Sequence, residues 1–202
     1  MGARSPRCLR SSVLAVGILT AIALPAFSQQ TPPSFGQSPR YQKYSQKLAP
    51  YVPSPQRVVD RMLEMASPKM GETVFDLGCG DGRVLITAAQ KFSAKAVGVE
   101  VDERLVQKAT ERIAQMNLQN QVRIVQGDLM QADLSSADVV VIYLLTGSNE
   151  MLRPRLEKML HPGARVVSYS YKIPGWKPLK VDRTDEQHGH EIYLYEMPPV
   201  KQ

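Results

Sequence analysis

Glu72-Thr73-Val74-Phe75-Asp76-Leu77-Gly78-Cys79-Gly80-Asp81-Gly82-Arg83 is the stretch of this chain that decides its fold. Its first half, rich in Val74, Phe75 and Leu77, predicts a buried β-strand. Glycine then occupies every second position from 78 to 82, which lets the backbone adopt positive φ and approach a ligand closely. Residues 83–91 predict a helix whose free N–H groups point at the same loop. Together they predict the opening of a nucleotide-binding α/β unit.

The spacing of the glycines indicates which kind of ligand the loop accepts. Dinucleotide-binding folds use G-x-G-x-x-G, whereas this loop reads G-x-G-x-G with Asp76 before it and Asp81 inside it. Carboxylates at these positions would repel a pyrophosphate and suit an ammonium or a sulfonium. The alternative is a tight strand-to-helix turn that binds no ligand.

Two further acids follow predicted strands. Glu100 ends a short strand that begins near Ala96, where an acid can accept hydrogen bonds from both ribose hydroxyls of a nucleoside. NAD-binding sites use a similar acid, so Glu100 alone does not identify the ligand. Asp102 is expected to cap the following helix. Asp128 lies in a Gly-Asp-Leu turn after the third strand.

The remaining pattern predicts an α/β fold with a doubly wound sheet, because helices and strands alternate before a terminal strand pair. Ser54 is expected to cap a helix that starts at Pro55. Residues 137–145 are a continuous apolar run, typical of a buried parallel strand. Ser148 is expected to cap the next helix, and residues 179–181 and 191–196 are expected to be the last strands.

The net charge of +6 is unevenly distributed. Residues 1–59 contain seven basic residues and no acid, which leaves 18 basic and 19 acidic residues in the rest of the chain. Residues 1–28 combine a basic start, a 12-residue apolar run and small residues, and predict a signal peptide or a membrane anchor. Residues 29–50 read as a flexible linker and residues 51–200 as the domain. The two cysteines predict no disulfide, and no spacing predicts a metal site.

The segment D-L-G-C-G-D-G-R resembles motif I of the class I S-adenosylmethionine (AdoMet) methyltransferases. This resemblance implies AdoMet as methyl donor and a Rossmann-like, three-layer α/β/α fold whose seven-stranded sheet has an antiparallel last strand. It also implies that Asp128 binds the adenine amine while Leu129 packs on the ring. The cofactor-binding residues implied are Asp76, Gly78, Cys79, Gly80, Asp81, Glu100, Asp128 and Leu129.

A narrower resemblance links the chain to the protein-lysine methyltransferases that modify the membrane-embedded ring of mitochondrial ATP synthase and the adenine nucleotide carrier. It rests on Pro50-Tyr51-Val52-Pro53-Ser54 and on residues 172–178, besides motif I and the two strand-end acids. It implies a protein lysine as acceptor, with membrane proteins among the candidates. Tyr51 and Ser54 are then candidates for a lid over the site, and Tyr143 for an acceptor contact.

Other functions stay open from the sequence. A nucleic-acid substrate is not expected, because the D/N-P-P-Y/F tetrapeptide of many amino-group nucleic-acid methyltransferases is replaced by Leu144-Leu145-Thr146-Gly147. The alternatives are a methyltransferase for a small molecule and an exported nucleoside-binding protein without catalysis. The leader predicts an exported or membrane-associated protein, or a membrane-anchored one with its domain on the side that contains AdoMet.

Overall fold

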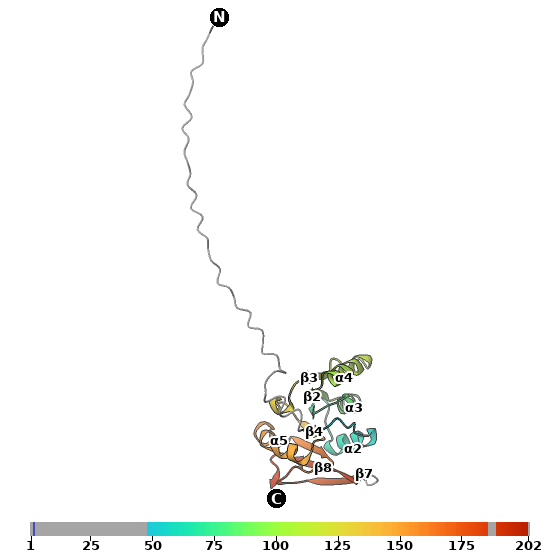
Figure 1. The fold of residues 1–202 in the computed structure, drawn as a ribbon, viewed down its shortest axis with the longest axis vertical. Coiled ribbons are helices and arrows are strands. Elements are labelled where there is room, and N and C mark those ends of the chain that lie inside the picture. Colours follow the sequence, from blue (N-terminus) through green and yellow to red (C-terminus); the bar gives the residue numbers. More distant parts are fainter. Residues whose placement is uncertain (1, 3–47, 186–188, 202) are drawn as a thin grey trace. The chain divides into compact units, whose positions relative to one another are not determined.

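In the computed structural model, the described residues are Gly2, 48–185 and 189–201. The predicted leader and all but the last three residues of the predicted linker lie outside them. Residues from 48 onward belong to one compact unit, drawn in colour in Figure 1. Within the described part of the chain, no helix has the length and apolar character needed to cross a membrane.

A seven-stranded sheet forms the centre of the domain, in the order β3-β2-β1-β4-β5-β8-β7. All neighbours pair in parallel except β8, which is antiparallel to both β5 and β7. The expected doubly wound sheet with an antiparallel last strand is therefore confirmed. The strands are β1 (Thr73–Leu77), β2 (Lys95–Glu100), β3 (Val122–Gln126), β4 (Val139–Ile142), β5 (Arg165–Tyr169), β7 (Lys180–Asp185) and β8 (His190–Glu196).

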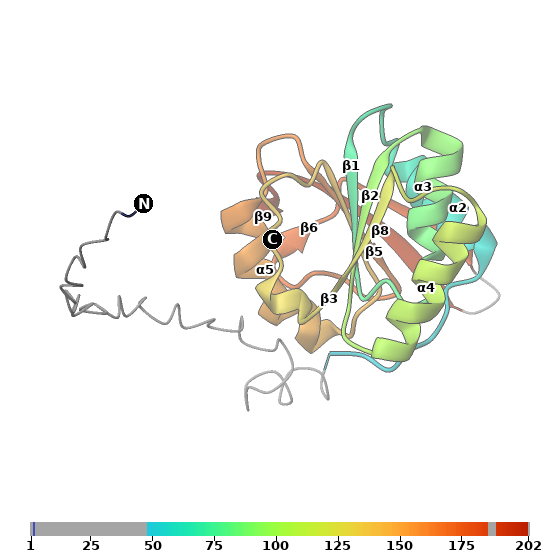
Figure 2. The ribbon, with the colours of Figure 1, turned by 90° about the horizontal axis from the view of Figure 1, so that it is seen from above.

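Helices cover both faces of the sheet and make the three expected layers. On one face lie α2 (Gln56–Ala66), α3 (Arg83–Phe92) and α4 (Glu103–Gln115), and on the other lies α5 (Thr146–Met159), as Figure 2 shows. The short helix η1 (Leu129–Gln131) and a small ribbon of β6 (Trp176–Lys177) and β9 (Val200–Lys201) complete the second face. Each face buries its own apolar cluster against the sheet.

Several local predictions hold in the structure. The apolar face predicted for the first helix is buried in α2, from Val58 to Met65. The Asp102 carboxylate caps α4 by accepting hydrogen bonds from the backbone N–H groups of Arg104 and Leu105. The run at 137–145 contains β4, whose four residues are all buried.

Two predicted helix caps are wrong. The residue before α2 is Pro55, and no side chain caps this helix, so Ser54 lies one residue too early. Ser148 lies inside α5, which starts at Thr146, and its hydroxyl instead donates to the Leu48 carbonyl at 2.6 Å. A hydroxyl in the first turn of a helix satisfies whichever acceptor packs nearest, and here that acceptor comes from a distant segment. The strand predicted at 179–181 also runs further, to Asp185, and β6 and β9 were not predicted.

The strand order places one edge of the sheet in position to bind a ligand. β1 pairs with β2 on one side and with β4 on the other, so the direction of the chain's progress across the sheet reverses between β1 and β4. Ligands of open α/β sheets bind outside the carboxyl ends of the strands at such a reversal. The glycine loop, Glu100 and Gly127 all follow strands at this edge.

Candidate active site

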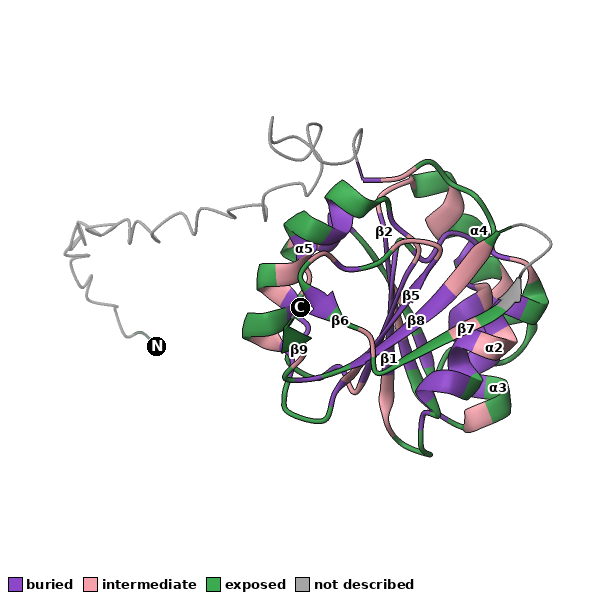
Figure 3. Ribbon diagram, turned by 90° about the horizontal axis from the view of Figure 1, so that it is seen from below, coloured by how far each residue is buried: buried purple, intermediate pink, exposed green. Residues whose placement is uncertain are grey.

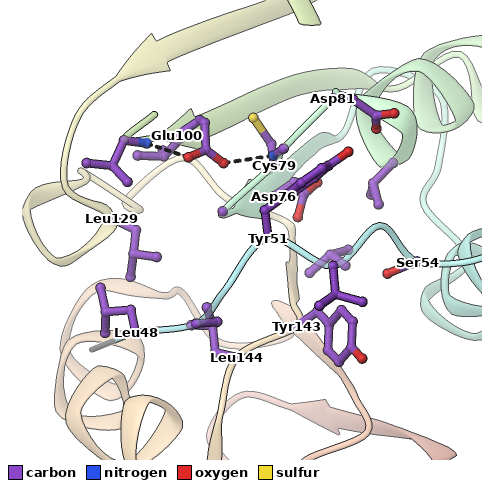
Figure 4. Close-up of a pocket in the computed structure, with 18 of the residues that line it drawn as sticks. Leu48, Tyr51, Ser54, Asp76, Cys79, Asp81, Glu100, Leu129, Tyr143 and Leu144 are labelled. Atoms are coloured by element: carbon purple, nitrogen blue, oxygen red, sulfur yellow. Dashed lines mark hydrogen bonds between the residues drawn. The ribbon is translucent and has the colours of Figure 1, made fainter. Parts of the chain in front are cut away.

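A pocket of about 940 Å³, open solvent at its mouth included, lies at the carboxyl ends of β1, β2, β3 and β4. It brings together every site residue predicted from the sequence, although these residues span positions 51 to 143. Figure 4 shows Leu48, Tyr51 and Ser54 along one stretch of chain, with Glu100 and Asp81 on the glycine-loop side. The predicted residues that line it are Tyr51, Ser54, Asp76, Gly78, Cys79, Gly80, Asp81, Glu100, Asp128, Leu129 and Tyr143.

Asp76 is a buried carboxyl at the end of β1. It is 6% exposed, and none of the described residues donates a hydrogen bond to it. Burial, followed by the charges of Glu100 and Asp81, raises the pKa of Asp76 to about 8. A buried acid without a partner is costly, and a cation in the pocket would relieve that cost.

Glu100 is buried, which corrects the expectation of an exposed strand end. One of its oxygens accepts from the Gly80 N–H at 2.9 Å, and the other accepts from the Val101 and Asp102 N–H groups at 2.8 and 2.9 Å. Figure 4 marks hydrogen bonds from this carboxylate to the backbone. Since a carboxylate offers about four acceptor positions, one remains for a ligand hydroxyl rather than the two expected.

Asp81 is not available to a cationic ligand, which corrects the role expected of its charge. Its carboxylate contacts Arg83 at 2.8 Å and Arg112 at 2.7 Å. Burial alone would raise the pKa of Asp81, but the hydrogen bonds and charges of the two arginines outweigh burial and lower it. Asp81 therefore stays ionised and joins the glycine loop to α3 and α4.

Asp128 and Leu129 form a site edge of mixed character. One Asp128 oxygen accepts from the Met130 N–H at 2.8 Å, and no described residue hydrogen-bonds the other. Leu129 is buried and adds an apolar surface beside this acceptor. Together they present one acceptor next to a flat apolar wall, which suits the exocyclic amine and ring of a purine.

Cys79 lines the pocket, but its sulfur faces the core. A Cβ placed on Gly98 would lie 2.5 Å from the Cys79 Sγ, so this sulfur packs against β2. Burial raises the pKa of the Cys79 thiol well above its usual value. Any contact from Cys79 to a ligand therefore comes from its backbone.

The strap, which we define as residues 48–55, crosses the pocket ahead of α2. The Tyr51 ring packs directly on Gly80, where a Cβ would lie 2.5 Å from a ring carbon, and this is why residue 80 lacks a side chain. The Ser54 carbonyl accepts from Arg83 at 2.6 Å, and the Leu48 carbonyl from Ser148. Arg83 thus holds the strap and the glycine loop at the same time.

The acceptor-side candidates lie near one another. Ser54 is buried at 8% exposure, and its hydroxyl has no hydrogen-bond partner among the described residues. Tyr143 follows β4 and is half-buried, with its ring centroid 4.6 Å from that of Tyr169. Tyr169 in turn packs edge-on against His190 of β8 at 5.5 Å, so three aromatic rings support this wall.

Sequence reasoning missed the apolar lining and the arginine connections. Residues such as Leu48 and Leu144 resemble ordinary core residues in the sequence, and only the motif D-G-R, with Asp81 and Arg83 two residues apart, signals an ion pair. Within residues 48–185 and 189–201, no group of three or more His, Cys, Asp or Glu side chains could hold a metal ion. The missed apolar lining residues include Leu48, Met62, Val84, Val99, Val141 and Leu144.

Comparison with known proteins identifies the family. A family model described as the ANTKMT methyltransferase domain matches residues 76–180, which is more than half of the chain. The chain belongs to this methyltransferase family. Like the rest of the class, it uses AdoMet as methyl donor. The sequence-based prediction of a class I AdoMet-dependent methyltransferase is confirmed.

Individual relatives place this methyltransferase more closely. It is 47% identical to a protein-lysine N-methyltransferase of Saccharolobus islandicus (strain REY15A), over 72% of this chain and 92% of that protein. It is 30% identical to a lysine N-methyltransferase of Rattus norvegicus that is named for a component of ATP synthase, over 73% of this chain and 66% of that protein. The narrower resemblance to lysine methyltransferases is therefore confirmed.

A solved structure adds a cofactor product to the comparison. A protein described as an RNA methyltransferase from Salinibacter ruber, crystallised with S-adenosyl-L-homocysteine, is 41% identical to this methyltransferase. The TM-score is 0.70, and the match covers 73% of this chain and 94% of the solved one. This similarity supports both the fold and the cofactor.

Proposed function

We propose that this protein transfers a methyl group from AdoMet to the ε-amino group of a lysine in a protein. The observation that carries the proposal is the Asp76 carboxyl, buried in the pocket beside Glu100 without a compensating cation among the described residues. Such a pocket favours positively charged ligands, and both AdoMet and a lysine side chain carry positive charge. The lysine acceptor is supported by the Saccharolobus and rat relatives.

The residues at the carboxyl edge fit AdoMet. We assign the free oxygen of Asp128 to the adenine amine, Leu129 to the ring, and the remaining acceptor position of Glu100 to a ribose hydroxyl. Asp76 and the glycine loop, from Gly78 to Asp81, face the methionine end. When bound, AdoMet supplies an electrophilic methyl group on a sulfonium.

The acceptor side must lower the pKa of the incoming amine. A free lysine has a pKa of about 10.4, so only about one in a thousand is deprotonated near neutral pH. The apolar lining and the nearby sulfonium charge both disfavour the ammonium form. Tyr143, Ser54 and Tyr51 lie where they can position the amine, and positioning alone supplies much of the rate in such transfers.

RNA is the rival acceptor, because the 41% identical solved protein is described as an RNA methyltransferase. Protein–RNA binding depends strongly on basic surface charge. From Asp60 onward this chain has 18 basic and 19 acidic residues, so the domain has no excess of positive charge. This balance favours a protein acceptor.

Tritiated-methyl transfer from AdoMet into membrane and soluble fractions tests the proposal. The fractions come from cells that lack this protein, and the full chain is added to them. We expect label that is sensitive to protease, resistant to nuclease and recovered as methyl-lysine after hydrolysis. A folded Glu100→Gln protein serves as the matched control, because its affinity for AdoMet is expected to be lower.

Each other outcome contradicts the proposal in its own way. Nuclease-sensitive label would identify an RNA methyltransferase, and label in small molecules would identify a small-molecule methyltransferase. Calorimetry that detects AdoMet binding without any transfer would identify a nucleoside-binding protein. Tighter binding of NADH than of AdoMet would contradict the assignment of the cofactor.

A further inference from the structure

The strap exposes an apolar surface at the mouth of the pocket. Pro50, Tyr51, Val52 and Pro53 are all exposed, with Tyr51 at 46% and Val52 at 53%. No charged residue occurs between Leu48 and Gln56. Figure 3 shows this stretch exposed for most of its length ahead of α2. Exposed apolar side chains that are contiguous, rather than single, mark a contact surface.

A second apolar side chain belongs to the same rim. Leu145 is 40% exposed and directly follows Leu144, which lines the pocket. The rim therefore has apolar contributions from both the strap and the segment between β4 and α5. Because the same residues cover the pocket, whatever binds this surface lies at the entrance of the acceptor site.

The sequence around the strap indicates an anionic partner. Lys47 and Arg57 flank it, and no acidic residue occurs anywhere before Asp60. Exposed apolar residues flanked by basic ones are the pattern of segments that bind the interface of an anionic membrane. A protein partner would require a complementary shape, whereas a bilayer requires only an apolar surface with basic flanks.

The connection of the chain supports the same partner. The described domain begins at Leu48, so the strap is its point of attachment to residues 1–47, which include the apolar run at 13–24. Any contact of those residues with a bilayer would bring the strap close to it. Attachment at the pocket mouth is therefore attachment of the catalytic side.

We infer that the strap is a membrane-contacting surface, with residues 50–53 in the headgroup region of an anionic bilayer and the pocket opening toward it. Interfacial segments of this kind lie about 5–10 Å into the boundary between headgroups and acyl chains. The inference goes beyond the proposed function, because it assigns the side of the domain on which an acceptor is presented. A lysine held at a membrane surface would meet the pocket directly.

Site-specific fluorescence on the full chain tests this inference. In a Cys8→Ser background, Val52→Cys or Met70→Cys is labelled with the environment-sensitive dye NBD, while the buried Cys79 stays unlabelled. Met70 is the matched control, because it is 84% exposed but precedes β1, at the opposite edge of the sheet. The vesicles are phosphatidylcholine with or without phosphatidylglycerol, and an AdoMet-induced thermal shift checks that each labelled protein is folded.

We expect NBD at position 52 to brighten, shift to shorter wavelength and be quenched by spin-labelled lipid when phosphatidylglycerol is present. The same dye at position 70 should not respond. Vesicle-bound protein without a response at 52 would show attachment through residues 1–47 alone and would overturn the inference. Equal responses at both positions, or no vesicle binding, would also overturn it.

A protein-docking surface has a different signature. In that case, NBD at position 52 would respond to a soluble acceptor protein and not to lipid, which would overturn the bilayer as partner. None of these readouts depends on methyl transfer. A failure here therefore leaves the proposed lysine methylation intact, and a failure of the methylation assay leaves this test intact.

Discussion

The Asp76 carboxyl shows how a single buried side chain links stability to ligand binding. Its pKa is raised to about 8 by burial and by two neighbouring acids. The ligand-free protein therefore holds a proton there at neutral pH, whereas the unfolded chain does not. A bound cation would favour the ionised form and release this proton.

The pH dependence of Asp76 has a definite sign. Between the pKa of an unfolded aspartate, about 4, and the folded value, the folded state binds more protons, so stability falls as pH rises. Asp76→Asn cannot titrate and should remove this contribution. Urea denaturation without AdoMet at about pH 5 and about pH 8 should give a smaller loss in the variant than in the natural protein. The same variant should bind AdoMet more weakly, and equal pH dependence in both proteins would contradict the role of Asp76.

Glu100 holds three backbone N–H groups, so its substitution has two effects. Glu100→Ala leaves these donors without their acceptor, and each buried unpaired donor costs about 1–3 kcal/mol. Glu100→Gln keeps one acceptor oxygen and removes the charge. We expect Glu100→Gln to weaken AdoMet binding by about 1.5–3 kcal/mol, or ~10–150-fold, while Glu100→Ala also lowers the unfolding midpoint. An unchanged dissociation constant in folded Glu100→Gln would remove Glu100 from the cofactor site.

Among the elements, the strap connects the cofactor side of the pocket to the acceptor side. Arg83 contacts Asp81 in the glycine loop and the Ser54 carbonyl in the strap. The Tyr51 ring lies on Gly80, and its hydroxyl hydrogen-bonds the Arg83 side chain. Two prolines stiffen the strap, which lowers the entropy lost when it is held in place. The strap is therefore built to cover the pocket, as a lid of fixed shape.

Tyr51→Ala should lower methyl transfer at saturating AdoMet far more than it lowers the melting temperature. The ring covers the glycine loop, whereas Tyr51 itself is 46% exposed and contributes little to the core. Tyr51→Phe separates the ring from the hydroxyl and should retain most of the activity if covering the loop is what matters.

Ser54→Ala is the companion variant within the strap. Because Ser54 does not cap α2, its substitution should leave stability nearly unchanged, and any loss of activity reports on the acceptor side. Full turnover by folded Tyr51→Ala would eliminate the lid.

For the whole molecule, residues 1–28 bear on where the domain works. Their basic and apolar order predicts export or membrane attachment. N-terminal sequencing of protein purified from its own cells should find either a start at Gln29 or a retained leader in the membrane fraction. A soluble cytosolic product that begins at Met1 would contradict both.

The sequence by itself determined the order and type of most elements, the position of the pocket and the cofactor class. Strand and helix periodicity, the glycine loop and the Asp102 cap all act within a few residues, so they can be read locally. The carboxyl ends of neighbouring parallel strands meet at one edge, which is why acids as distant as Asp76 and Asp128 were correctly assigned to one site.

Only the tertiary structure decided what these side chains are bonded to. The pairing of Asp81 with Arg112 joins the glycine loop to α4, and the Ser148 hydroxyl reaches Leu48 across 100 positions. The burial of Glu100 and the raised pKa of Asp76 depend on how the strap and the loops enclose them. Hydrogen bonds and charges are settled by the nearest partner in space, and no local pattern in the sequence specifies that partner.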